Sequence, residues 1–239
     1  MIAMRTIALL PLLSLALAGC SMLPGGGGER DARTTNAGRA STAPAPRIAA
    51  PLPAARSAAA AQCLSALGQS GVRFDPLPDR YREQGCATLG TVQMHALRGD
   101  SGDLGVSNIG PVTCPVGAAF AAWARFGVDR AARQILGSPL ASIQTMGSYS
   151  CRNVAGSTRR SAHATAAAID VGGFTLADGR RITVQAGWNG GTAAEREFLR
   201  TVQRSACRRF GTVLGPDYNA AHHDHLHVEG VVEGNSYCR

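Results

Sequence analysis

Six of the seven cysteines, all after residue 60, limit what this chain can fold into more than any other feature of its sequence. An even number of cysteines spread over one region of an exported chain is typical of a disulfide framework. No CxxC pair is present to favour a zinc–thiolate site instead. The sequence therefore predicts three disulfides among Cys63, Cys86, Cys114, Cys151, Cys207 and Cys238. Their pairing stays open, although Cys63 and Cys86 are near neighbours that would close a modest loop.

The first residues, MIAMRTIALLPLLSLALAGC, predict export. An arginine precedes an apolar run that is too short for a membrane-spanning helix and that ends in small residues. Residues 17–20, Leu-Ala-Gly-Cys, resemble the bacterial lipobox, which implies removal of residues 1–19 as a signal peptide and lipidation of Cys20. Ser21 follows that cysteine, which resembles the pattern of outer-membrane sorting. We expect a periplasmic lipoprotein anchored in the outer membrane through Cys20; the alternative is an ordinary signal peptide with an incidental cysteine.

Residues 20–60 are rich in Gly, Pro, Ala and Ser and have almost no aromatic or large apolar pattern. Such a composition cannot bury enough apolar surface to fold, so we expect a disordered tether. A flexible coil of this length has a root-mean-square end-to-end distance of about 35 Å. The remaining residues, 61–239, are enough for one domain with its own core.

The charge of the chain limits its partners. The formal net charge is +8, and all 24 basic residues are arginine. A basic exported protein favours anionic polymers of the cell envelope. The compartment and the lack of any recognition motif exclude nucleic acid, and we expect a monomer.

Two stretches have helical apolar spacing. In residues 114–136 this spacing predicts one or two helices, with Phe120, Trp123 and Phe126 in an aromatic stripe that belongs to the core. In residues 192–210 it predicts another helix, which begins at a threonine N-cap.

The strand patterns surround these helices. Residues 168–176 and 180–185 alternate like the strands of a hairpin around an Asp-Gly turn, and residues 211–215 and 225–231 read as further short strands. Helices around such strands predict an α+β fold, with a mostly antiparallel sheet flanked by helices.

The segment NAAHHDHLHVEG contains four of the six histidines of the chain. In an extended segment alternate side chains share a face, so His225 and His227 point the same way. Upstream stand His163 and Asp170, and an aspartate among Ala, Ile and Val is costly to bury without a cation. Two imidazoles, one carboxylate and an open fourth position are typical of a catalytic zinc site. The alternative for the histidine-rich segment alone is an exposed loop that binds metal adventitiously.

The order of these residues resembles a known zinc site. Ser161, His163 and Asp170 match S-x-H-x-x-x-x-x-x-D, and His225 and His227 match the later H-x-H of the LAS group. This group comprises lysostaphin-type enzymes, D-alanyl-D-alanine metallopeptidases and the hedgehog signalling domain. The seven-residue step from the first histidine to the aspartate is similar to the D-alanyl-D-alanine branch.

Within that group the chain is similar to the extensin-like C-terminal domain family of bacteria. The resemblance rests on YSCR, SAHATAAAIDVGGF, TVLGPDYNAAHHDHLHVEG and the terminal YCR, and it spans nearly all of residues 60–239. It implies a LAS or hedgehog-like zinc peptidase fold. The D-alanyl-D-alanine branch usually has glycine at the sixth position of the motif S-x-H-x-x-G-x-A-x-D. This chain has Ala166 there, which is one methyl group larger.

The resemblance also implies a role for each matching residue. The ligands of Zn²⁺ would be His163, Asp170 and His227, the catalytic residues Asp224, His225 and His222, and the substrate-binding residues Arg152 and Ser161. His223 would be exposed to solvent. Asp224 would suit proton transfer if burial raised its pKa, and His225 would suit it without any shift, so the choice of general base stays open.

These roles imply a zinc-dependent hydrolase of peptidoglycan. It would cleave D-alanyl peptide bonds of stems or cross-links, either as a D,D-carboxypeptidase or as an endopeptidase. The alternative is a peptidoglycan-binding or scaffold lipoprotein that zinc stabilises without turnover, since fold and site do not fix function.

Overall fold

The computed structural model describes residues 57–239. The expected signal peptide, Cys20 and nearly all of the expected tether lie outside the described residues. Within the described part of the chain, no helix is both long and apolar enough to cross a membrane.

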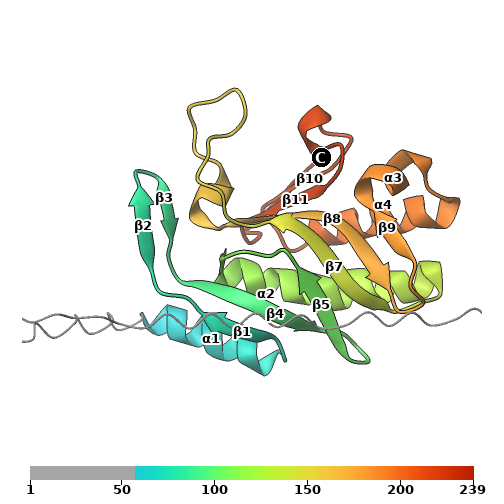
Figure 1. Cartoon of the computed structure of the whole chain (residues 1–239), viewed down its shortest axis with the longest axis horizontal. Coiled ribbons are helices and arrows are strands. Elements are labelled where there is room, and N and C mark those ends of the chain that lie inside the picture. Colours follow the sequence, from blue (N-terminus) through green and yellow to red (C-terminus); the bar gives the residue numbers. More distant parts are fainter. Residues whose placement is uncertain (1–56) are drawn as a thin grey trace, which may run out of the picture. The chain divides into compact units, whose positions relative to one another are not determined.

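Most strands of this domain join one sheet (Figure 1). The strands are β1 Arg73–Pro76, β2 Arg80–Glu83, β3 Cys86–Thr88, β4 Thr91–Arg98, β5 Asp103–Ser107, β6 Val112–Thr113, β7 Leu140–Gly147, β8 Ala168–Leu176, β9 Arg181–Thr183, β10 Thr212–Leu214, β11 Leu226–Glu229 and β12 Tyr237–Cys238. The sheet of the described residues has ten strands in the order β1-β4-β5-β7-β8-β11-β10-β12, with β6 beside β4 and β9 beside β8. Only β5–β7 and β10–β12 are parallel pairs, so the predicted mostly antiparallel sheet is confirmed.

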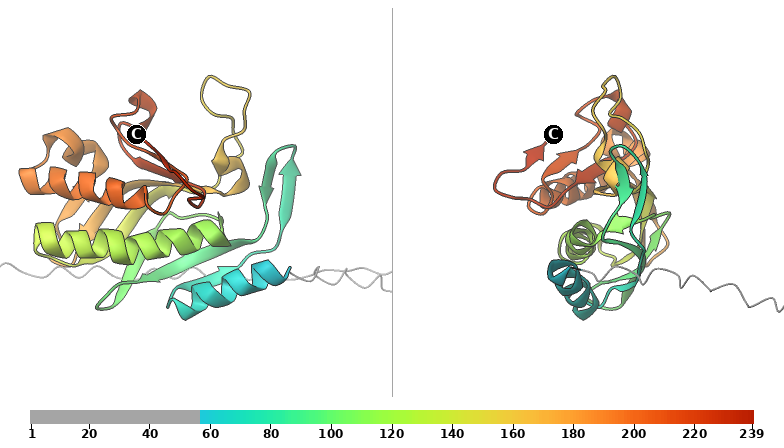
Figure 2. Two further views of the ribbon diagram at one scale, coloured as in Figure 1. Left: turned by 180° about the vertical axis from the view of Figure 1, so that it is seen from behind. Right: turned by 90° about the vertical axis from the view of Figure 1, so that its left-hand side faces the viewer.

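Helices cover one face of this sheet. They are α1 Ala58–Gln69, α2 Cys114–Trp123 with its wider continuations η1 Ala124–Asp129 and η2 Ala132–Leu136, α3 Val184–Gly190 and α4 Ala193–Ala206. Two short 3₁₀ turns, η3 Ala162–Thr165 and η4 Ala220–His222, lie in the loops. Figure 2 shows α1, α2 and α4 on the same side of the sheet. The predicted α+β class is confirmed.

The helix α4 begins where the sequence predicts. Thr192 and Glu195 form a reciprocal capping box, in which each side chain accepts a hydrogen bond from the backbone N–H of the other residue. The apolar face of α4 is then buried through Phe198, Leu199 and Val202.

The prediction for the aromatic stripe of residues 114–136 is wrong at one position. Phe120 and Trp123 are fully buried, but Phe126 is 44% exposed. After Trp123 the helix widens into the π-type turns of η1, which changes the direction of the following side chains. Phe126 therefore turns outward, where the guanidinium groups of Arg125 and Arg130 lie over its ring.

Three disulfides connect separate elements of the domain, as the sequence predicts. Cys63–Cys114 joins α1 to α2, Cys86–Cys151 joins β3 to the loop after β7, and Cys207–Cys238 joins the end of α4 to β12. The near neighbours Cys63 and Cys86 do not pair, because one lies on α1 against α2 and the other on the β2–β3 hairpin.

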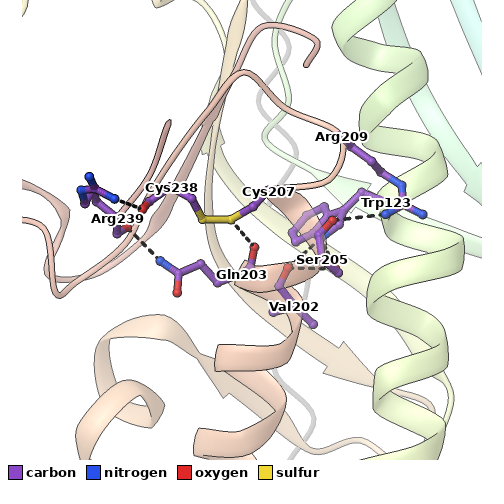
Figure 3. The surroundings of a disulfide bond; sticks show 8 residues. All are labelled: Trp123, Val202, Gln203, Ser205, Cys207, Arg209, Cys238 and Arg239. Atoms are coloured by element: carbon purple, nitrogen blue, oxygen red, sulfur yellow. Dashed lines mark hydrogen bonds between the residues drawn. A yellow bond between two sulfur atoms is a disulfide. The ribbon is translucent and has the colours of Figure 1, made fainter. Parts of the chain in front are cut away.

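Figure 3 shows how the third disulfide lies beside the core. Cys207 follows α4, and α4 also binds the indole of Trp123. The indole Nε1 donates to the Val202 carbonyl oxygen, 3.0 Å away, and to the Ser205 hydroxyl oxygen, 2.9 Å away. Gln203 donates to the carbonyl of Arg239, 2.9 Å away. The last strand is thus attached to α4 both covalently and by hydrogen bonds.

We expect the loss of the first disulfide to weaken the fold and to spare the metal affinity. Cys63 and Cys114 are 51 residues apart, so replacing both with alanine should lower the free energy of unfolding by about 4 kcal/mol on the chain-entropy estimate. Urea unfolding measures the loss, and zinc titration of the same variant provides the comparison. Free thiols at most of the six positions in the exported protein, or a loss of zinc affinity as large as the loss of stability, would contradict this expectation.

Candidate metal centre

Two adjacent strands present an acid and an imidazole to the face of the sheet opposite the helices. Asp170 on β8 lies directly across from His227 on β11. On β8 the neighbours of Asp170, Ile169 and Val171, are fully buried in the core. On β11 the same holds for Leu226 and Val228. Since side chains alternate along a strand, Asp170 and His227 are turned away from the helices.

His163 reaches the same place from the short turn η3. The hydroxyl of Ser161 caps this turn by accepting a hydrogen bond from the His163 N–H, 3.4 Å away. Ala166 then ends the turn with a φ of 55°, in the left-handed region. This conformation favours glycine, because a residue with a Cβ atom is strained in it. Ala166 adopts the same conformation at a cost of about 1–2 kcal/mol.

The three side chains converge on one point. His163 Nε2 lies 3.2 Å from His227 Nδ1 and 3.2 Å from an Asp170 carboxylate oxygen, and His227 Nδ1 lies 2.8 Å from the other oxygen. The ligands of a tetrahedral zinc ion lie about 3.4 Å apart, given bonds of about 2.1 Å. The donor set and its spacing therefore fit zinc.

The outer nitrogen of each imidazole is also held. His163 Nδ1 donates to the carbonyl of Ser148, 3.2 Å away, and His227 Nε2 donates to the carboxylate of Glu229, 3.1 Å away. Such partners orient histidines that bind metals. The sequence reasoning missed Glu229, although its place two residues after His227 on a strand puts both side chains on one face.

The predicted catalytic residues lie beside these three. His225 Nε2 is 3.4 Å from an oxygen of Asp170, and His225 Nδ1 donates to the carboxylate of Asp224, 2.8 Å away. The ring of His222 lies 5.2 Å from that of His225. His223 keeps 62% of its side chain exposed, as expected.

Asp224 does not meet the condition that would make it a good base. The hydrogen bond from His225 outweighs burial and lowers the pKa of Asp224 below its usual value. Asp224 therefore stays ionised at neutral pH and acts as the partner that orients the imidazole of His225. Burial, together with the charges of His225 and His227, lowers the pKa of His222 to about 4, so that ring is neutral at the same pH.

The comparisons with known proteins add one result. The profile of the family described as extensin-like protein C-terminus matches residues 61–239. The chain belongs to the extensin-like C-terminal family. Searches of curated proteins and of solved structures found no match.

In this extensin-like domain the candidate metal centre opens into a cavity of about 500 Å³. Its lining includes four residues predicted for substrate or catalysis, Arg152, Ser161, His222 and His225, and also Arg159 and Tyr218. Among the described residues, the guanidinium groups of Arg152 and Arg159 have no hydrogen-bond or ion-pair partner. The cavity thus combines three imidazoles and the carboxylate of Glu229 with two positive charges from the loop between β7 and η3.

Proton binding by His227 has a consequence for metal binding. Burial by itself lowers the pKa of His227, but hydrogen bonds to Asp170 and Glu229 outweigh it and raise that pKa to about 9. Burial likewise opposes ionisation of Asp170, yet the hydrogen bonds from His163 and His227 hold its pKa well below the usual range. At neutral pH the metal-free site therefore holds a carboxylate beside a protonated imidazole.

We expect zinc to release about one proton on binding near pH 7, because only neutral imidazole is a ligand. The affinity for zinc should therefore rise with pH and level off above about 9. Calorimetry in two buffers of different ionisation enthalpy counts the protons. Glu229→Gln is the control: it removes one cause of the raised pKa and should reduce the release. An affinity that stays constant between pH 6.5 and 9 would show that His227 is not a ligand.

Proposed function

We propose that this extensin-like domain is a zinc-dependent hydrolase of peptidoglycan that cleaves D-alanyl peptide bonds. The observation that carries the proposal is the convergence of His163, Asp170 and His227 beside the hydrogen-bonded pair of Asp224 and His225, at the edge of a cavity.

The ligand set favours a catalytic ion over a structural one. His163 Nε2, Asp170 and His227 Nδ1 would hold the zinc. A structural zinc usually has four protein ligands, whereas a catalytic one keeps a position open to water or substrate. Zinc bound here would acidify a water molecule and polarise the carbonyl of a peptide bond.

The protein's own part in the reaction is proton transfer. Asp224 holds the Nδ1–H of His225, which leaves the Nε2 of His225 directed toward Asp170 and free to accept a proton. His225 can take a proton from the attacking water and deliver it to the leaving amine. The ionised Asp224 stabilises the imidazolium that forms in between. This arrangement favours His225 as the general base and Asp224 as the residue that positions it.

The cavity suits a peptide that carries a carboxylate. Arg152 and Arg159 can bind such a group by charge-assisted hydrogen bonds, and Arg is well shaped for bidentate contacts with carboxylates. Stem peptides of peptidoglycan carry free carboxylates and D-alanyl bonds. A lipid anchor at Cys20 and a tether over residues 20–60 would keep the domain, as a monomer, within reach of this polymer.

Digestion of purified muropeptides with and without a chelator tests the proposal. We expect cleavage of a D-alanyl bond that the chelator stops. A protein that binds peptidoglycan sacculi but cleaves no D-alanyl bond in stems or cross-links would instead be a zinc-stabilised binding or scaffold lipoprotein.

A further inference from the structure

A second, smaller cavity lies beside the β2–β3 hairpin. It has a volume of about 240 Å³, and it shares no lining residue with the cavity of the metal centre. Its lining includes Arg80, Arg82 and Tyr149. Figure 1 shows the hairpin and the loop after β7 projecting from the sheet near each other.

The two arginines carry charge that the protein does not neutralise. Arg80 and Arg82 both lie on the exposed strand β2, and both line the cavity. Among the described residues, neither guanidinium has a hydrogen-bond or ion-pair partner, and no residue that lines this cavity is acidic. The adjacent Asp79 accepts a hydrogen bond from the Gly90 N–H, 2.8 Å away. Most other described arginines are paired, as Arg160 is with Glu83.

Tyr149 adds a hydrogen-bond donor to the same cavity. Its hydroxyl is buried and has no hydrogen-bond partner among the described residues. A buried polar group without a partner destabilises the fold, so a ligand that accepted a hydrogen bond from this hydroxyl would recover the lost interaction.

The walls of the cavity are tied together. The disulfide Cys86–Cys151 joins β3 to the segment that contains Tyr149, and Arg160 binds Glu83 and the carbonyl of Gln84 across the same junction. The backbone segments that carry Arg80, Arg82 and Tyr149 are therefore fixed relative to one another before any ligand arrives, which lowers the entropy cost of binding.

We propose that this cavity binds an oxyanion, either a carboxylate or a phosphate group. Arg80 and Arg82 supply the positive charge, and the Tyr149 hydroxyl donates a hydrogen bond to an oxygen of the ligand. The site is independent of the proposed hydrolysis and of zinc, because none of its residues lines the metal centre.

Nuclear magnetic resonance of the full-length protein, labelled with ¹⁵N and without added zinc, tests the proposal. The protein is titrated separately with sodium acetate and sodium phosphate at constant ionic strength, while the Nε–H signals of Arg80 and Arg82 and the backbone signal of Tyr149 are followed. We expect saturable shifts with at least one anion, and the anion that saturates identifies the group as carboxylate or phosphate.

Two variants identify the binding groups. Arg80→Gln with Arg82→Gln should weaken binding about tenfold or more, the usual scale of lost charge-assisted hydrogen bonds, and Tyr149→Phe should weaken it with the ring packing kept. Arg208→Gln removes an exposed arginine outside both cavities and should leave binding unchanged. Shifts that do not saturate with either anion, or that persist unchanged in both variants, would overturn the proposal.

Discussion

Asp170→Ala is expected to remove bound zinc and peptidoglycan cleavage together. Asp170 is the one carboxylate among the three converging side chains, and it lies within hydrogen-bonding distance of both His163 and His227. Without it, two imidazoles remain as ligands. The affinity of the protein for zinc should then fall by more than about 100-fold, which exceeds the usual loss when a residue that only hydrogen-bonds to a ligand is removed. Metal analysis after dialysis and zinc titration measure the change.

Asp75→Ala is the matched control for this variant. Asp75 also pairs with a histidine on the neighbouring strand, His95, at 2.9 Å, but both side chains are exposed and far from the cavity in sequence and sheet order. This control should keep its zinc and its activity. A protein that keeps one zinc per chain after loss of Asp170 would place the metal elsewhere.

His225→Ala is expected to keep zinc and to lower turnover by about 100-fold or more, the usual scale of a lost general base. Asp224→Asn should also keep zinc and slow turnover, because the amide can no longer hold His225 in the required tautomer. Zinc content and the rate of D-alanyl release are measured on the same preparations. His223→Ala serves as the control, since this histidine of the same segment is exposed to solvent.

The outcomes of these variants separate three roles. Loss of zinc from His225→Ala would make His225 a fourth ligand and would favour a structural ion. Unchanged turnover in both His225→Ala and Asp224→Asn, with zinc bound, would show that neither residue takes part in proton transfer.

Local patterns were sufficient to predict much of the fold and the cluster of candidate ligands. The alternation around Asp170 and His227 predicts which face each occupies, because burial of Ile169 and Val228 leaves only one direction for the polar side chains. The helix cap at Thr192 can also be predicted from the local sequence, since it depends on residues within one turn of the helix.

Features that depend on distant partners could not be predicted in this way. The disulfide pairing follows from which elements pack together, so Cys63 meets Cys114 and not its neighbour in sequence. The direction of the pKa shift at Asp224 depends on the contact with His225, and the outward turn of Phe126 on a local widening of the helix. Strand alternation places Glu229 on the same face as His227, but no motif marks it as a partner of that histidine.

We propose that a metal bound by His163, Asp170 and His227 serves to hydrolyse peptidoglycan. The most direct test is digestion of purified sacculi and muropeptides by the zinc-loaded protein and by Asp170→Ala, with every product identified by mass. We expect the zinc-loaded protein alone to release products of D-alanyl bond cleavage, and the mass of the released fragment to distinguish a carboxypeptidase, which frees D-alanine, from an endopeptidase, which divides a cross-link. Zinc-loaded protein that leaves every D-alanyl bond intact while it binds sacculi would contradict the claim.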